Sequence, residues 1–124
     1  MKVMVFGKAT KDTEAGVPPD PKAMEAMGKY TEALIAAGIL KDMVFGGLKP
    51  TRFAKRVLFS GDDPTVIDGP FAETKEVVAG FMLWEVKSIE EAVEWVKKGP
   101  TVSDSIVEIR QLYSLEDFEA WENK

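Results

Sequence analysis

The chain of 124 residues contains no cysteine and no histidine. The absence of cysteine excludes disulfide bonds, zinc–thiolate sites and thiol nucleophiles. The absence of histidine removes the usual general base near neutral pH and the commonest metal ligand. Any acid–base chemistry must therefore use aspartate, glutamate, lysine or tyrosine with a shifted pKa, and we expect neither a metal site nor a cofactor.

Basic residues are also scarce, with 16 lysines and arginines against 21 aspartates and glutamates and a net charge of −5. Since nucleic-acid binding needs clustered cations, we expect no nucleic-acid partner, although one or two cations would suffice for a small anion. The apolar run in residues 1–7 is too short for a signal peptide, and no run approaches the roughly 20 residues that span a bilayer. We predict a cytoplasmic protein without a membrane partner.

The apolar content of 45% is sufficient for one hydrophobic core. Because no linker or low-complexity tract divides the chain, we predict one domain over residues 1–112, with residues 113–124 as a helical tail of the same domain. Apolar or alternating runs indicate strands at residues 3–6, 43–48, 53–59, 65–67, 77–86 and 105–112. With the helices between them, this order predicts an α+β, ferredoxin-like βαβ-βαβ fold with an inserted β-hairpin and an antiparallel sheet.

Good N-cap residues precede three predicted helices: Asp20, Ser88 and Ser114. On the first helix, Met24 and Met27 are candidates for soft groups that face a ligand, although methionines more often fill gaps in a core. Residues 8–19 form a polar segment that we interpret as a long loop, either a lid over a site or a plain surface loop.

The strand at residues 77–86 is the strongest strand signal, because its first eight residues carry no charge. A strand this apolar is covered on both faces. In a fold of two layers the helices cover one face of the sheet, and a second subunit is the simplest cover for the other. The sequence therefore predicts a homodimer.

The stretch Asp68–Glu76 reads DGPFAETKE and predicts a fixed bend between two strands. Asp68 is able to bond to the backbone that follows it, and Gly69 tolerates a positive φ. Pro70 has a fixed φ and keeps the residue before it out of the helical region. Phe71 then offers a large apolar anchor.

These nine residues resemble the signature of the DGPF group within the YCII-related family, and the resemblance extends over about the first 112 residues. Supporting features are the apolar strand at residues 3–6, the pair Gly80-Phe81 and the run at residues 107–110. The resemblance implies a ferredoxin-like sandwich that dimerises into an α/β barrel. Most members have no assigned activity. The resemblance also implies that the gene often lies next to that of an alternative sigma factor. Some YCII-like proteins carry a His–Asp pair suited to acid–base work, which this chain lacks.

Asp68 and Glu73 are the candidate catalytic residues, with Asp68 as the base and Glu73 as its partner. Phe71 and Lys75 are candidate ligand-binding residues, Lys75 as an anion clamp. The plainer interpretation is that Asp68 caps a turn and that the charges behind Phe71 are solvated.

Glu108 and Arg110 lie on the face of the last strand opposite Val107 and Ile109. If Val107 and Ile109 face the helices, Glu108 and Arg110 face the interior of a dimeric barrel. Charges there are costly unless they are paired or face a ligand, and arginine is a good carboxylate receptor. We therefore expect Arg110, with Glu108 beside it, to bind a small acidic metabolite; the plainer alternatives are an ordinary Arg–Glu ion pair or an exposed edge.

Three functions remain open at this point. The first is a lyase or isomerase that uses carboxylates and one cation without a metal. The second is a ligand-binding or accessory module without catalysis, and the third is a purely structural homodimer. A cavity that contains two neighbouring carboxylates would favour the enzyme, whereas a cavity lined by aromatic residues with one arginine would favour binding alone.

Overall fold

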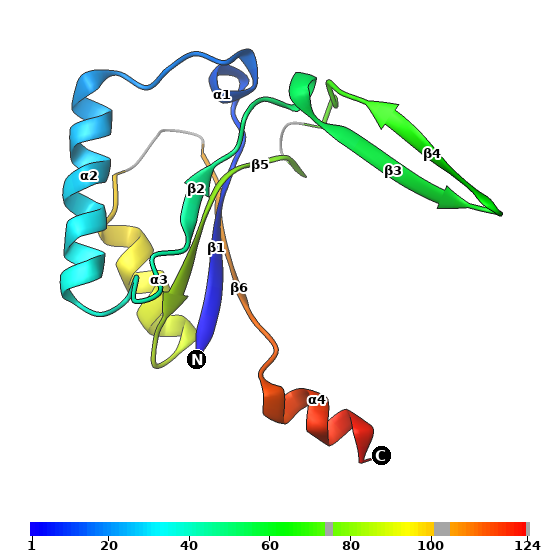
Figure 1. Cartoon of the computed structure of the whole chain (residues 1–124). Helices are drawn as coiled ribbons and strands as arrows, with labels where there is room; N and C mark the ends of the chain where they lie inside the picture. Colours follow the sequence, from blue (N-terminus) through cyan, green and yellow to red (C-terminus); the bar gives the residue numbers. More distant parts are fainter. Residues whose placement is uncertain (74–75, 101–104, 124) are drawn as a thin grey trace.

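The computed structural model of the protein describes residues 1–73, 76–100 and 105–123. Its main sheet has four antiparallel strands in the order β2-β5-β1-β6. These strands are β1 (Lys2–Lys8), β2 (Phe45–Gly47), β5 (Val78–Glu85) and β6 (Val107–Gln111). Helices α2 (Pro21–Ala36) and α3 (Ile89–Lys98) lie on one side of this sheet (Figure 1). The predicted α+β class and antiparallel sheet are confirmed.

The helices begin at the residues that the sequence indicates. The Asp20 carboxylate accepts a hydrogen bond of 2.8 Å from the Ala23 N–H at the start of α2. At the start of α3, the Ser88 hydroxyl accepts from the Glu91 N–H at 3.1 Å. The predicted return bond of the capping box is shifted by one residue, because the Glu91 carboxylate accepts from the Lys87 N–H at 3.0 Å.

The hydrophobic core lies between the two helices and the sheet. Val3 and Val5 of β1 stand opposite Trp84 and Met82 of β5, and Val3 and Trp84 are fully buried. The helices and the segment after α2 add further buried side chains, namely Leu34, Ile39, Leu40 and Ala92. Because side chains alternate along a strand, the residues between these positions point to the other side of the sheet.

That other side, which we call the open face, carries Met4 opposite Leu83 and Phe6 opposite Phe81. All four side chains are only partly buried, and neither α2 nor α3 lies on this side (Figure 1). The prediction that a helical layer covers one face of the sheet and leaves an apolar second face is thus confirmed within this chain.

Two parts of the chain extend beyond the sheet (Figure 1). Strands β3 (Lys55–Ser60) and β4 (Asp63–Asp68) form a separate antiparallel hairpin, in which Gly61 has the positive φ that the tight turn requires. At the other end of the sheet, α4 (Leu115–Glu122) follows β6 and begins at a capping box of Ser114 and Asp117. Of the helices in the described residues, none is long and apolar enough to cross a membrane.

Two local predictions are wrong. Residues 8–19 are not a plain loop, because Thr10 caps a short helix, α1 (Lys11–Ala15), and Gly16 ends it at a φ of 78°. Phe53 is not part of a strand but belongs to a 3₁₀ turn, η1 (Thr51–Phe53), that follows Pro50. In both cases a short capped turn, closed by hydrogen bonds within a few residues, interrupts a segment that hydropathy alone does not resolve.

The bend at Asp68–Glu76 is held by a junction around Thr51, which is buried. The Thr51 hydroxyl donates to the Glu14 carboxylate at 2.5 Å and accepts from the Phe71 N–H at 3.0 Å. The Glu14 carboxylate also accepts from the Thr51 N–H at 2.9 Å, and the Gly69 N–H donates to the Ala54 carbonyl at 2.9 Å. Helix α1, the turn η1 and the bend therefore meet at one buried hydroxyl.

The junction predicts a strict requirement for glycine at position 69. A Cβ at Gly69 would collide with the Thr51 backbone, whereas a Cβ at Gly28, in the middle of α2, would meet nothing within 4 Å. We expect Gly69→Ala to lower the free energy of unfolding by about 1–3 kcal/mol. Gly28→Ala, the matched control, should raise it by about 0.5–1 kcal/mol. Chemical denaturation measures both, and equal effects would contradict the predicted role of the junction.

Candidate ligand-binding site

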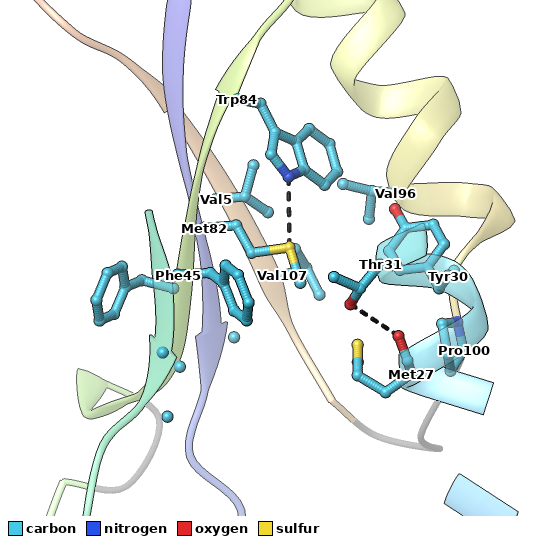
Figure 2. Close-up of a pocket in the computed structure, with 16 residues that line it drawn as sticks. Val5, Met27, Tyr30, Thr31, Phe45, Met82, Trp84, Val96, Pro100 and Val107 are labelled. Carbon is cyan, nitrogen blue, oxygen red and sulfur yellow. Dashed lines mark hydrogen bonds between the residues drawn. The ribbon is translucent and has the colours of Figure 1, made fainter. Parts of the chain in front are cut away.

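A cavity of about 430 Å³ lies between helices α2 and α3 and the helix-facing side of the sheet. Figure 2 shows its walls, which are mostly apolar and aromatic. The labelled lining residues are Val5, Met27, Tyr30, Thr31, Phe45, Met82, Trp84, Val96, Pro100 and Val107. The volume falls in the range typical of small-molecule sites.

The cavity exists because one row of the sheet has almost no side chains. Gly80 of β5 stands opposite both Gly7 of β1 and Gly47 of β2, so three neighbouring strands present glycine at the same level. All three line the cavity, and a Cβ at Gly7 would meet nothing within 4 Å. On the far side of Gly7, β6 contributes Val107 to the same row. The glycine row thus forms a floor that the helices do not fill.

Few polar groups reach this space. The Tyr30 hydroxyl donates at 2.5 Å to the Trp95 carbonyl, one of the last carbonyls of α3, and the Thr31 hydroxyl donates at 2.8 Å to the Met27 carbonyl. The Trp84 indole N–H points to the Met82 sulfur at 3.4 Å (Figure 2). The two hydroxyl oxygens keep lone pairs that are able to accept a hydrogen bond from a ligand.

Charge is absent from the described lining of the cavity. Burial raises the pKa of Tyr30 from 10.0 to about 12, so its hydroxyl stays neutral at physiological pH. No cluster of three or more metal-ligating side chains occurs in the described residues. The described walls are therefore suited to bind an uncharged molecule through contact area and one or two hydrogen bonds, and they carry no acid or base that titrates near neutral pH.

The residues predicted around the bend lie outside this cavity. Asp68 forms a salt bridge of 2.5 Å with Lys55, and 72% of its side chain is exposed. Phe71 packs beneath the Arg56 guanidinium, which lies 3.6 Å from its ring centre. Glu73 is exposed, and Lys75 lies outside the described residues. The structure thus brings Asp68 and Phe71 to the same bend, and their predicted catalytic and ligand-binding roles stay predictions.

Glu108 and Arg110 lie on the open face, beside Phe6 and Met4 respectively. The Glu108 carboxylate is 3.5 Å from the Lys8 ammonium, whereas Arg110 forms no salt bridge with any described residue. Val107 lines the cavity and Ile109 packs against the core, so the predicted division of this strand into two faces holds. The sheet itself separates Glu108 and Arg110 from the cavity.

Sequence reasoning identified only a small part of the cavity. Met27 was a candidate ligand-facing residue and does line the cavity, whereas Met24 does not. Tyr30 and Trp84 fit the apolar pattern of a core, and nothing in that pattern distinguishes a packed ring from one that borders a void. A usable signal is the set of glycines within otherwise β-favouring segments, because each marks a strand position without a side chain to pack.

The comparisons with known proteins identify a family but no activity. The sequence profile of the YCII-related domain matches residues 1–116. An uncharacterized protein of Rhizobium meliloti (strain 1021) is 33% identical over 78 residues, which make up 63% of this chain and 61% of that protein. The chain thus matches less than two thirds of the length of that relative.

Among solved structures, the chain is similar to the 5-chloro-2-hydroxyhydroquinone dehydrochlorinase from Burkholderia phenoliruptrix AC1100, in complex with 2,5-dihydroxybenzoquinone. It shares 19% sequence identity with a TM-score of 0.47, over 94% of this chain and 99% of that chain. A likeness at this level does not bear on substrate or reaction.

The environment of Tyr30 predicts a loss of stability at high pH. Between pH 10 and about 12 the unfolded chain releases this proton while the folded chain retains it, so the stability from neutral Tyr30 is complete below pH 10 and falls as the pH rises. We expect Tyr30→Phe to reduce the slope with which the free energy of unfolding falls as the pH rises. Tyr113→Phe, a change on an exposed ring, is the control. Urea denaturation over this pH range measures the slopes, and identical slopes for wild type and Tyr30→Phe would refute the assignment.

Proposed function

The chain belongs to the YCII-related domain family, and we propose that it is a homodimeric protein that binds a small, uncharged aromatic molecule in the cavity between its sheet and its helices. The observation that carries this proposal is the composition of the cavity wall. Four aromatic residues (Tyr30, Phe45, Phe81 and Trp84) and two methionines line the cavity above a floor of glycines, and the described lining includes no charged side chain. An aromatic cavity of this kind favours binding over acid–base catalysis.

The chemistry of the wall indicates the class of ligand. The rings of Tyr30, Phe45 and Trp84 favour a planar partner, because aromatic rings attract each other in offset or edge-to-face contacts. Met27 and Met82 add polarizable sulfur and adapt to irregular outlines. The free lone pairs of the Tyr30 and Thr31 hydroxyls favour a ligand with a hydroxyl or amide N–H donor. A carboxylate would find no described cation among the lining residues to offset its loss of hydration.

The lyase or isomerase interpretation has less support. It requires Asp68 as the base and Glu73 as its partner, and both side chains are exposed and outside the cavity. Arg110 as an acceptor for an acidic metabolite has more support, because its guanidinium has no described carboxylate partner. Its place on the open face puts such a ligand at the dimer interface rather than in the cavity.

The homodimer is supported by the apolar character of the open face. Met4, Phe6, Phe81 and Leu83 form a central apolar strip on β1 and β5, and an amphipathic sheet must bury such a strip against another layer. A second copy that uses the same face provides this layer through a two-fold axis. Two sheets packed in this way generate the α/β barrel that the family resemblance implies.

The ligand proposal predicts that one substitution on α2 closes the cavity while the same substitution one turn away does not. Met27 lines the cavity, whereas Met24 is 61% exposed and does not line it. We expect wild type and Met24→Trp to bind a common compound from a panel of uncharged aromatic alcohols and amides. Met27→Trp should weaken that binding by about tenfold or more. A thermal-shift screen finds the compound and titration calorimetry measures its Kd.

A second variant approaches the cavity from the sheet. Gly7→Val places a β-favouring side chain on the glycine floor and should weaken the same binding. Binding that survives both Met27→Trp and Gly7→Val would overturn the cavity as the site. Hits confined to a parallel panel of carboxylic acids would instead favour Arg110 on the open face, and chemical conversion of any hit would favour the enzyme.

The dimer proposal predicts that a charge on the open face separates the subunits. We expect Phe6→Glu to be monomeric at concentrations at which wild type is dimeric, because burying the new carboxylate without a partner costs several kcal/mol. Met24→Glu introduces the same charge on the exposed side of α2 and serves as the control. Sedimentation velocity measures the outcome. A wild-type chain that stays monomeric, or a Phe6→Glu chain that remains dimeric, would contradict this interface.

A further inference from the structure

The β3–β4 hairpin leaves apolar side chains without cover. Val57 faces Val66 and Phe59 faces Pro64 on one side of the hairpin, and Phe59 is 81% exposed. Because an isolated two-stranded hairpin is only marginally stable in water, a ribbon with so much exposed apolar surface requires a partner layer. The hairpin does not lie along the main sheet of its own chain (Figure 1).

Helix α4 has the complementary surface. Tyr113, Phe118 and Trp121 form an aromatic cluster with ring centres 4.7–5.8 Å apart, and half of the Trp121 side chain remains exposed. The helix also carries four acidic residues and no basic residue. None of these carboxylates forms a salt bridge with a described residue. An aromatic surface bordered by negative charge thus faces solvent.

The base of the hairpin carries the opposite charge. Arg52 packs 4.6 Å from the Phe53 ring centre and Arg56 packs 3.6 Å from the Phe71 ring centre. Neither guanidinium forms a salt bridge with a described carboxylate. The hairpin therefore offers exposed apolar side chains on both faces, with Arg56 on the face of Leu58 and Ile67 and with Arg52 in the turn before β3. These features match the aromatic and acidic surface of α4 in both hydrophobicity and charge.

Within one chain these two surfaces are far apart. The bend at the base of the hairpin leads into β5 at the end of the sheet where Gly80 faces Gly7, whereas α4 follows Gln111, which faces Val3 at the other end. The seven residues of β1 separate these ends by about 20 Å. In Figure 1 the hairpin and α4 both extend to the right of the sheet, away from α2 and α3.

We propose that α4 of one copy docks on the β3–β4 hairpin of a second copy. We call this the arm contact, and the homodimer contains two of them, one in each direction. A two-fold axis that lies between the facing sheets, perpendicular to their strands, reverses the strand direction in the second copy. The hairpin end of one sheet then lies beside the α4 end of the other sheet. The same rotation that makes one contact makes the other. This inference rests on the proposed homodimer, and it adds to the open face a second surface through which the two copies contact each other.

Charge reversal tests the contact. Reversal on α4 alone (Glu116→Lys with Glu119→Lys), or on the hairpin alone (Arg52→Glu with Arg56→Glu), should weaken the dimer by about tenfold at low salt. All four changes in one chain restore opposite charges and should bring the Kd back toward the wild-type value. Sedimentation equilibrium measures these constants, and circular dichroism checks that each variant is folded.

The outcomes separate the two proposals. If wild type is dimeric and charge reversal on α4 leaves the Kd unchanged, the arm contact is overturned while the homodimer stands. If wild type is monomeric throughout, the homodimer fails and the arm contact fails with it. Restoration of the Kd by the fourfold variant supports the contact. If the substitutions on α4 or on the hairpin had simply unfolded that element, changes in the other element would not repair it.

Engineered cysteines supply a second measurement, since the natural chain contains none. A chain with Val57→Cys and Phe118→Cys presents one thiol on the hairpin and one after the first turn of α4. We expect oxidation to give a covalent dimer on a non-reducing gel. A disulfide that forms within one chain at any protein concentration would overturn the exchange, because α4 would then fold back onto its own hairpin.

Discussion

The alternation of side chains along β1 and β5 is the constraint on which the rest of the structure depends. Residues such as Val3, Val5 and Trp84 point toward α2 and α3 and form the core, so their neighbours Met4, Phe6 and Leu83 must point the other way. Exchanging the two sets would require a one-residue change of register, which would expose the core. The open face is therefore an unavoidable consequence of building the core.

The cavity follows from the same pairing. Gly7, Gly47 and Gly80 leave the floor empty only because the register places them on one level of three adjacent strands. Tyr30 holds the wall on the other side by bonding to the end of α3, and Gly99 makes room for it, since a Cβ there would lie 3.0 Å from the Tyr30 ring. The void is thus supported from the floor and from the helices.

The DGPF bend has an evident structural role. Thr51 is a buried hydroxyl that satisfies both Glu14 and the Phe71 N–H, and Gly69 passes so close to the Thr51 backbone that no side chain fits. Leaving the buried Thr51 hydroxyl unpaired would cost roughly 1–3 kcal/mol. This cost favours the arrangement in which Glu14 and the Phe71 N–H stay bonded to it. The bend fixes where the hairpin leaves the domain.

Much of this protein was readable from its sequence. The caps at Asp20, Ser88 and Ser114, the uncharged run that becomes most of β5 and the antiparallel α+β order depend on local spacing, and local spacing is visible along the chain. Helix α1 and the turn η1 were missed, because a capped turn of a few residues produces too little periodicity. The cavity was missed because its glycines are separated by more than thirty residues in the chain and become neighbours only through strand pairing. The sequence by itself determined the elements and the apolar second face, whereas the register of β1, β2 and β5 decided where the cavity lies, since only pairing turns scattered glycines into one empty floor.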